Sequence, residues 1–232
     1  MADKEKRGKG RSFIFPFSRA DARRFTALLG RLSADKAAAL SYSLIALAES
    51  ADQGGLQPND LRFFVPQAFA SLAGRMPEDR ATAVAQKAVS IGVKATKAVT
   101  VLTLSGVYEK LAGRLPAEQA SGGASALAEK ALSLAAQAPA GAALDRRYLS
   151  WAFAALAGRL PPDQAARGAS ALAHHAVSAA AKLPDSQTQA SVFQAVAGSL
   201  GPPEAAAMAG QITALAGKES DADPLSNAAG EP

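Results

Sequence analysis

The chain contains no cysteine and only two histidines, and these shortages remove most routes to chemistry. Without cysteine there can be no disulfides, thiolate metal ligands or cysteine nucleophiles. His174 and His175 are adjacent, whereas a helical metal pair needs two residues four positions apart. The chain also lacks a GxxxxGKS or GxxxxGKT phosphate loop, and it has no GxGxxG loop after a strand. We therefore predict a protein that is not an enzyme, with no cofactor, no metal and no small-molecule substrate.

Long apolar runs are also missing. No apolar stretch approaches 18 residues, and no signal-peptide core is present, so the sequence predicts neither a membrane span nor classical secretion. The absence of cysteine is compatible with a reducing compartment, and we predict a cytoplasmic location.

The net charge of +5 is confined to one end of the chain. Residues 1–24 carry eight Lys or Arg and three Asp or Glu, and the other 208 residues balance at 17 of each sign. We therefore interpret 1–17 as a basic flexible arm that includes a short apolar segment, SFIFPF. This segment could cap the first repeat, which we favour, or it could act with the arm (residues 7–17) as an anchor on an anionic membrane surface.

Aromatic residues make up only 6% of the chain, yet five of them occupy equivalent positions in a repeat. The repeat is marked by the motifs LLGRLS, LAGRMP, LAGRLP, LAGRLP and VAGSLG, whose glycines are 44, 39, 45 and 40 residues apart. These glycines are Gly30, Gly74, Gly113, Gly158 and Gly198. An aromatic residue precedes each glycine by five positions: Phe25, Phe69, Tyr108, Phe153 and Phe193.

Each motif joins two predicted helices. Aliphatic residues two before and two after the glycine share one helical stripe with the aromatic residue, which predicts a bulky first helix. Alanine and other small residues at 7, 11, 14 and 18 positions after the glycine predict a second helix that packs closely. Proline followed by a carboxylate predicts the start of that second helix, and Ser33 replaces proline as a cap in the first copy.

The fold class predicted is all-α, a right-handed α-solenoid of five helical-hairpin repeats over 18–217, followed by a disordered tail at 218–232. The predicted helices are Ser18–Leu32, Ala34–Ser50, Asp60–Leu72, Pro77–Ile91, Lys97–Leu115, Ala117–Ala136, Leu144–Leu160, Pro162–Lys182, Gln187–Leu200 and Pro202–Ala216. Between the hairpins, long and short loops are expected to alternate. Gly122 and Gly123 lie inside a predicted helix, where they indicate either close packing or a kink. We favour packing, because Gly168 occupies the same repeat position as Gly123.

The spacing of about 40 residues resembles that of HEAT and armadillo repeats. The corners GRLPAEQA (Gly113–Ala120) and GRLPPDQA (Gly158–Ala165) resemble more closely the alanine-rich α-solenoid repeats that occur in tandem in many bacterial proteins. The resemblance covers Ser18–Gly217. It implies a surface for protein interaction or scaffolding and no defined chemistry.

Two sets of residues are candidates for binding. Arginine follows the repeat glycine at Arg31, Arg75, Arg114 and Arg159. We expect each arginine to meet the acidic start of the second helix, and the alternative is a row of guanidinium groups that faces a phosphate backbone. The second set is Arg146, Arg147, Tyr148 and Trp151, the most recognition-like cluster in the chain. We predict a protein-binding or scaffolding module; the alternative is binding of nucleic acid or an anionic membrane through the arm and the arginines.

Overall fold

A computed structural model describes residues 27–53, 58–139, 141–180 and 186–221. Within these residues the secondary structure is entirely helical, without a strand. The elements are α2 (Ala34–Asp52), α3 (Pro58–Leu72), η1 (Ala73–Arg75), α4 (Glu78–Gly92), α5 (Ala98–Ala112), α6 (Ala117–Gln137), α7 (Ala143–Ala157), α8 (Pro162–Ala180), α9 (Ser186–Val196), η2 (Ala197–Ser199) and α10 (Pro202–Asp221). No helix in this part of the chain has both the length and the apolar content needed to cross a membrane.

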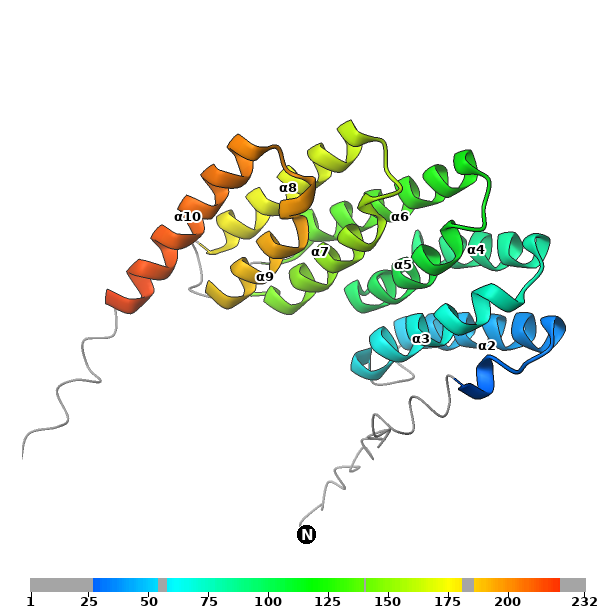
Figure 1. The fold of residues 1–232 in the computed structure, drawn as a ribbon. Coiled ribbons are helices and arrows are strands. Elements are labelled where there is room, and N and C mark those ends of the chain that lie inside the picture. Colours follow the sequence, from blue (N-terminus) through cyan, green and yellow to red (C-terminus); the bar gives the residue numbers. More distant parts are fainter. Residues whose placement is uncertain (1–26, 54–57, 140, 181–185, 222–232) are drawn as a thin grey trace, which may run out of the picture.

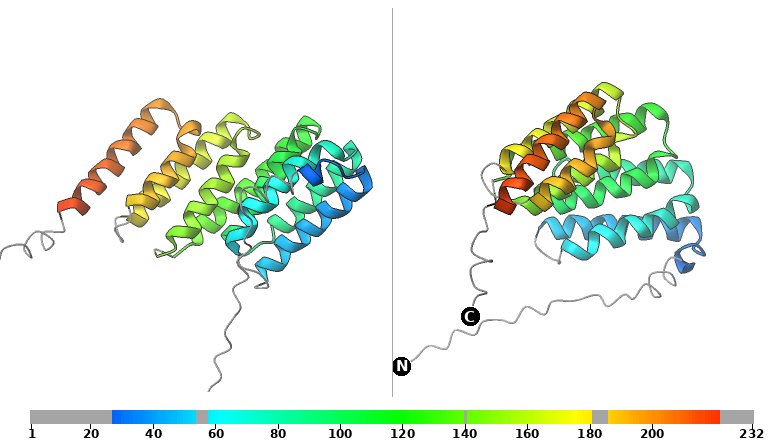
Figure 2. Two further views of the ribbon diagram at one scale, coloured as in Figure 1. Left: turned by 60° about the horizontal axis from the view of Figure 1, so that its bottom comes forward. Right: turned by 60° about the vertical axis from the view of Figure 1, so that its left-hand side comes forward.

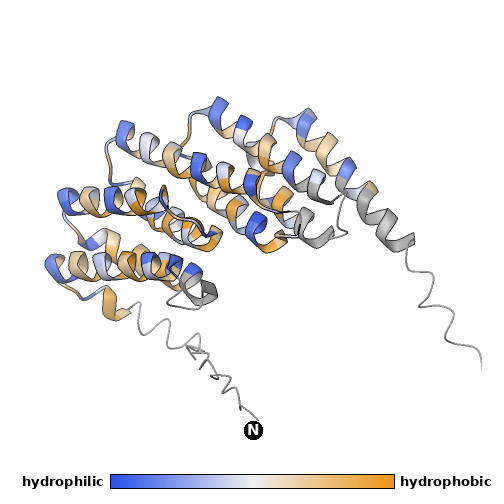
Figure 3. Cartoon of the chain, turned by 180° about the vertical axis from the view of Figure 1, so that it is seen from behind, coloured by the Kyte–Doolittle hydropathy of each residue, from blue (hydrophilic) through white to orange (hydrophobic). Residues whose placement is uncertain are grey.

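The helices form two layers that run the length of the molecule (Figure 1). Helices α2, α4, α6, α8 and α10 lie side by side in one layer, and α3, α5, α7 and α9 lie side by side in the other. Figure 2 shows the same order from two further directions. Apolar side chains from both layers form one continuous core. In Figure 3, hydrophilic residues gather at the helix ends beside the corners, the short segments that contain the repeat glycines.

The corners end α5, α7 and α9 earlier than the sequence predicts, whereas α3 ends at the predicted Leu72. Gly113 and Gly158 are the C-caps of α5 and α7, so these helices end three residues before the predicted Leu115 and Leu160. The chain then makes a tight turn in which the Arg114 amide donates to the Leu111 carbonyl at 2.8 Å. Two copies instead continue as the short 3₁₀ helices η1 and η2. Tightening of this kind is a common way to satisfy the last carbonyls of a helix.

Proline and carboxylates start the second helices as predicted. Pro77 and Pro116 are the N-caps of α4 and α6, and Pro162 and Pro202 are the first residues of α8 and α10. The first turns carry Asp35, Glu78, Asp79, Glu118, Asp163 and Glu204. These charges complement the positive end of the helix dipole. Ser33 does occupy the N-cap position of α2, but its side chain makes no capping hydrogen bond.

The bulky stripe is buried in the central copies. Phe69, Tyr108 and Phe153 are fully buried, whereas Phe193 is partly buried and Phe25 lies outside the described residues. The aliphatic position two before the glycine is buried in the second to fifth copies (Leu72, Leu111, Leu156 and Val196). The first copy differs from the prediction, because Leu28 is 61% exposed and Leu29 is buried in its place.

The glycines inside the second helices allow close packing, as predicted. A Cβ atom on Gly123 would lie 2.3 Å from the hydroxyl oxygen of Tyr108, and one on Gly168 would lie 2.3 Å from the ring of Phe153. The aromatic residue of one helix therefore rests directly on the backbone of the next, in two successive copies. Nothing lies within 4 Å of the corresponding position on Gly122.

The predicted alternation of long and short loops is not seen where the structure bears on it. The α4–α5 connection, predicted short, and the α6–α7 connection, predicted long, each span five residues, and the other two connections lie mostly or wholly outside the described ranges. The helix α10 runs to Asp221, so 218–221, which the sequence assigns to the tail, are helical. Lys218 and Glu219 are good helix formers, whereas Gly217 is not. The predicted arm at 1–17 and the rest of the tail, 222–232, lie outside the described residues.

A carboxylate links the end of α2 to the start of α5. Asp52 accepts hydrogen bonds from the Thr96 amide (3.1 Å), the Thr96 hydroxyl (3.1 Å) and the Lys97 amide (2.9 Å), and Lys97 Nζ donates to the Ala51 carbonyl at 2.9 Å. Burial on its own raises the pKa of Asp52, but the hydrogen bonds from Lys97 and Thr96 outweigh it, and the pKa lies below its ordinary value. Asp52 thus acts as an N-terminal cap for a helix that begins 46 residues later.

Candidate binding groove

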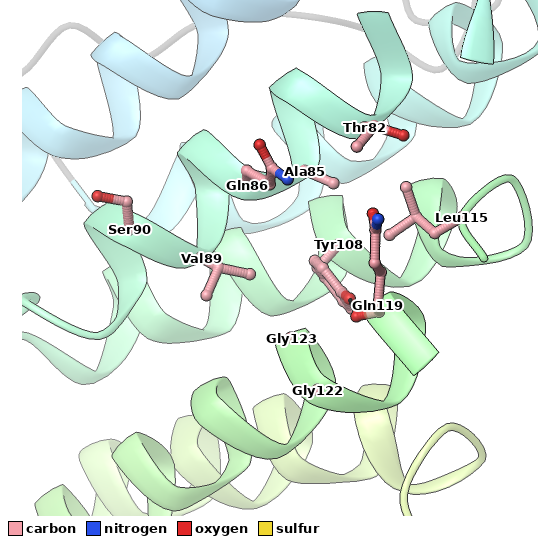
Figure 4. Close-up of a pocket in the computed structure, with 10 residues that line it drawn as sticks. All are labelled: Thr82, Ala85, Gln86, Val89, Ser90, Tyr108, Leu115, Gln119, Gly122 and Gly123. Atoms are coloured by element: carbon pink, nitrogen blue, oxygen red, sulfur yellow. Dashed lines mark hydrogen bonds between the residues drawn. The ribbon is translucent and has the colours of Figure 1, made fainter. Parts of the chain in front are cut away.

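The described residues enclose a groove of about 360 Å³ between α4 and α6, with α5 beneath it (Figure 4). We call it the α4–α6 groove. It is lined by Thr82, Ala85, Gln86, Val89, Ser90, Tyr108, Leu115, Gln119, Gly122 and Gly123. None of these residues carries a charge at neutral pH.

The floor of the groove is apolar. Tyr108 projects from α5, and its hydroxyl donates to the backbone carbonyls of Gln119 (2.8 Å) and Ala120 (3.0 Å) in the first turn of α6. The hydroxyl is therefore committed to α6, and the ring, with Ala85, Val89 and Leu115, provides the apolar surface. Burial raises the pKa of Tyr108, an effect that the charge of Arg159 partly offsets. Tyr108 is accordingly a neutral, fixed part of the floor.

The walls carry carboxamides that are not engaged. Gln86 on α4 and Gln119 on α6 both have exposed side chains, and neither carboxamide makes a hydrogen bond to another described residue. Thr82 and Ser90 add hydroxyl groups along the α4 side. Each carboxamide offers a carbonyl acceptor and an NH₂ donor. The groove thus combines an apolar floor with two free amide groups, one on each wall.

The equivalent crevice one copy further on is bridged by hydrogen bonds. Between α6 and α8, Ser125 and Gln164 occupy the repeat positions of Gln86 and Gln119. The Ser125 hydroxyl donates to Gln164 Oε1 at 2.7 Å, and Gln164 Nε2 lies 3.5 Å from Glu129 Oε1. Arg167 stands where the α4–α6 groove has Gly122. Side chains of α6 and α8 therefore bridge this crevice.

The crevice one copy earlier has larger side chains at two of these positions. Between α2 and α4, the buried side chains of Met76 and Val84 occupy the repeat positions of Leu115 and Gly123. The Ser41 hydroxyl lies 3.5 Å from the Met76 sulfur across the crevice. The α4–α6 groove differs from the α6–α8 crevice by Gly122 in place of Arg167 and by glutamines that form no hydrogen bond across it. It differs from the α2–α4 crevice by Gly123 in place of the buried Val84.

The predicted cluster on α7 is mostly built into the fold. Arg146 is only 8% exposed, and its Nη2 donates to the carbonyls of Ala138 (2.9 Å) and Pro139 (2.7 Å), which fixes the end of α6 against α7. Tyr148 is 3% exposed, and its ring stacks against the guanidinium of Arg62, 4.7 Å from the ring centroid.

The other half of the cluster is more accessible. The Arg147 guanidinium lies 5.3 Å from the ring centroid of Trp151, and both side chains are partly exposed. The Trp151 and Tyr148 rings are 6.0 Å apart and tilted by 36°. The structure thus brings all four predicted residues together, and a binding role for the exposed pair Arg147 and Trp151 stays a prediction.

The arginines at the corners do not form the expected ion pairs with carboxylates. Within the described residues, Arg31, Arg75, Arg114 and Arg159 have no carboxylate oxygen within 4.0 Å. Two of them instead approach the preceding corner. Arg114 donates to the Ala73 carbonyl, and Arg159 Nη2 would lie 3.6 Å from a Cβ atom on Gly113.

The edge formed by the corners therefore has mixed charge. Arg31, Arg75 and Arg159 are exposed, but the same edge carries the first-turn carboxylates of the second helices. A phosphate backbone would meet these carboxylates as well as the guanidinium groups. His174 and His175 are exposed.

Sequence analysis did not identify the α4–α6 groove. The signal for it was the pair Gly122–Gly123, which was interpreted only as a packing feature. Gly123 does serve packing, whereas Gly122 is open to the groove. Comparison of the chain with protein-family models, with curated proteins and with solved structures gave no match.

Proposed function

We propose that the chain is a right-handed α-solenoid of five helical hairpins that acts as a non-catalytic protein-binding module. The order of the helices supports the architecture, because each helix packs against its counterpart in the next pair within the same layer. The recurring burial of Phe69, Tyr108 and Phe153 supports it as well. We keep a cytoplasmic location as part of the proposal, since a chain without cysteine suits a reducing compartment.

The observation that carries the binding function is the open α4–α6 groove, which no hydrogen bond between α4 and α6 side chains bridges in the described part of the chain. Its volume of about 360 Å³ is within the range of pockets that hold ligands. The groove has a buried apolar floor and polar walls. Protein interfaces show a similar arrangement, because their apolar centre is surrounded by a polar rim. Among the lining residues no histidine, carboxylate or amine stands ready to activate the hydroxyls of Thr82 and Ser90, and binding is the function that we propose for the groove.

The experiment compares the full-length chain with a variant that fills the groove. In Gly122→Leu the new side chain has room at its Cβ, so the helix should fold while the leucine occupies the groove. Gly210→Leu is the matched control, because Gly210 is an exposed glycine of α10 with nothing within 4 Å of its Cβ position. Proteins cross-linked to the wild-type chain are identified, and each is purified and its binding measured.

The proposal expects at least one purified protein that binds the wild-type chain and Gly210→Leu equally but loses binding to Gly122→Leu. If no purified protein binds, or if every one binds Gly122→Leu as well as the wild type, the groove is not the functional site. Binding of nucleic acid or anionic vesicles that falls steeply with salt would favour the alternative function.

A further inference from the structure

Resting on this function, we propose that the α4–α6 groove holds one uncharged apolar residue of an extended protein segment, with Gln86 and Gln119 bonding to the peptide groups on either side of it.

The absence of charge in the lining selects an uncharged occupant. No lining residue could neutralise a carboxylate or an ammonium group that entered the groove. Moving an unpaired charge from water into such a site is costly, whereas an apolar side chain gains from losing its contact with water.

The floor selects an apolar side chain. The Tyr108 hydroxyl already donates to two carbonyls of α6, and Val89, Ala85 and Leu115 offer no hydrogen-bonding group in their side chains. A polar side chain that reached the floor would therefore lose its hydrogen bonds to water without replacement.

The walls select a peptide backbone. A peptide unit presents one N–H donor and one C=O acceptor, and a carboxamide presents both complementary groups. The neighbouring crevice demonstrates the reach of a glutamine at this repeat position, because Gln164 spans it to bond with Ser125. Gln119 has no such partner on α4, where Gln86 stands opposite with its own carboxamide free (Figure 4).

Gly122 provides the access. With no side chain and nothing within 4 Å of its Cβ position, it leaves room for a backbone to approach α6 closely. An extended segment is the form that exposes peptide groups in this way, because a helix uses its own internally.

The test uses N-acetyl-leucinamide as the probe, since it carries one apolar side chain between two peptide groups. It is titrated into the ¹⁵N-labelled full-length chain and followed by amide chemical shifts. We expect shifts at Gln86, Gln119, Gly122 and Gly123, with a dissociation constant on the order of 1 mM for so small a ligand. N-acetyl-lysinamide and N-acetyl-glutamic acid amide should bind at least about ten-fold more weakly.

Variants then distinguish binding of the apolar side chain to the floor from hydrogen bonding of the peptide groups to the walls. Gly122→Leu should abolish the shifts and Gly210→Leu should leave them unchanged. The double variant Gln86→Ala/Gln119→Ala should weaken N-acetyl-leucinamide about ten-fold while leaving toluene, which has no peptide group, unaffected. Folding of every variant is checked by circular dichroism.

The inference is overturned if N-acetyl-leucinamide causes no change in amide chemical shifts at a concentration of about ten times the expected dissociation constant. It is equally overturned if the charged probes bind as well as the leucine probe, or if the glutamine variant binds it unchanged. These failures differ from failure of the proposed function. Suppose that a protein requires Gly122 for binding but does not compete with any apolar probe. The proposed protein-binding function would then hold, and the proposed occupant of the groove would be rejected.

Discussion

Alanine at Gly122 and alanine at Gly123 should change the stability of the protein in opposite directions, although the two residues are neighbours in one helix. At Gly122 the added methyl group meets nothing within 4 Å, so the substitution should stabilise the protein by up to about 1 kcal/mol through helix propensity and a less flexible unfolded chain. At Gly123 the same gain is present, but the methyl group would lie 2.3 Å from the Tyr108 hydroxyl oxygen and 2.5 Å from Cζ.

The ring of Tyr108 therefore has to move by more than an ångström when Gly123 becomes alanine. Crowding of this kind in a packed core costs about 1–3 kcal/mol. The bifurcated hydrogen bond from the hydroxyl to the Gln119 and Ala120 carbonyls would also be lost, at about 1 kcal/mol. After subtraction of the propensity gain of up to about 1 kcal/mol, we expect Gly123→Ala to destabilise the protein by about 1–3 kcal/mol.

The measurement is urea denaturation followed by circular dichroism, with m-values compared to ensure that the transitions are of the same kind. The double variant Tyr108→Ala/Gly123→Ala provides the control, because alanine at 123 should be harmless once the ring is gone. If Gly123→Ala is as stable as Gly122→Ala, or if its cost persists in the absence of the Tyr108 ring, the proposed packing of the ring on the backbone is wrong.

Three further predictions concern Asp52, Tyr108 and Arg114. Asp52→Ala should lower stability by about 1–2 kcal/mol, the usual cost of losing a helix cap. Because the folded pKa of Asp52 lies below its unfolded value, this contribution should be complete above the unfolded pKa and disappear as the pH falls through the folded pKa; acid titration of wild type against Asp52→Asn, measured as urea midpoints, checks the sign. Burial raises the pKa of Tyr108, so its contribution should be complete below the ordinary pKa of 10.0 and be lost as the pH rises through the folded value, a loss that Tyr108→Phe should not show in alkaline melts. Arg114→Ala removes the bond to Ala73 and should cost about 1 kcal/mol, whereas Arg75→Ala, at an exposed side chain, should change the melting temperature little; equal effects would contradict the link between corners.

Much of the fold could be predicted from the sequence because it depends on local periodicity. The spacing of the aromatic and aliphatic residues placed Phe69, Tyr108, Phe153 and Leu111 on buried faces, and proline with carboxylates marked where second helices begin. The shared column of Gly123 and Gly168 predicted their close packing correctly. These features need only the geometry of one helix and its partner.

The features that failed depend on distances between helices. Arg114 was assigned to its own corner, but it reaches Ala73 in the preceding one, and no sequence pattern reports the offset between stacked pairs. The groove could not be predicted either, because it depends on a hydrogen bond between helices. Gln164 on α8 accepts one from Ser125 on α6, whereas Gln119 on α6 has no such partner on α4. In the first copy Leu29 is buried where the pattern placed Leu28. A shift of one residue rotates the buried face of a helix by about 100°, and the repeat pattern of the first copy does not reveal it.

The hydrogen bonds at Asp52 also affect how a ligand could enter. They bind the end of α2 to Thr96 and Lys97, directly after the turn that follows α4, so the C-terminal end of α4 is anchored to its outer neighbour. One wall of the groove is thereby braced from behind, and the opposite wall, α6, has its first turn attached to the floor through Tyr108. Arg146 also holds the end of α6 through the Ala138 and Pro139 carbonyls, so both walls are fixed and the groove should discriminate against occupants too bulky for its present width.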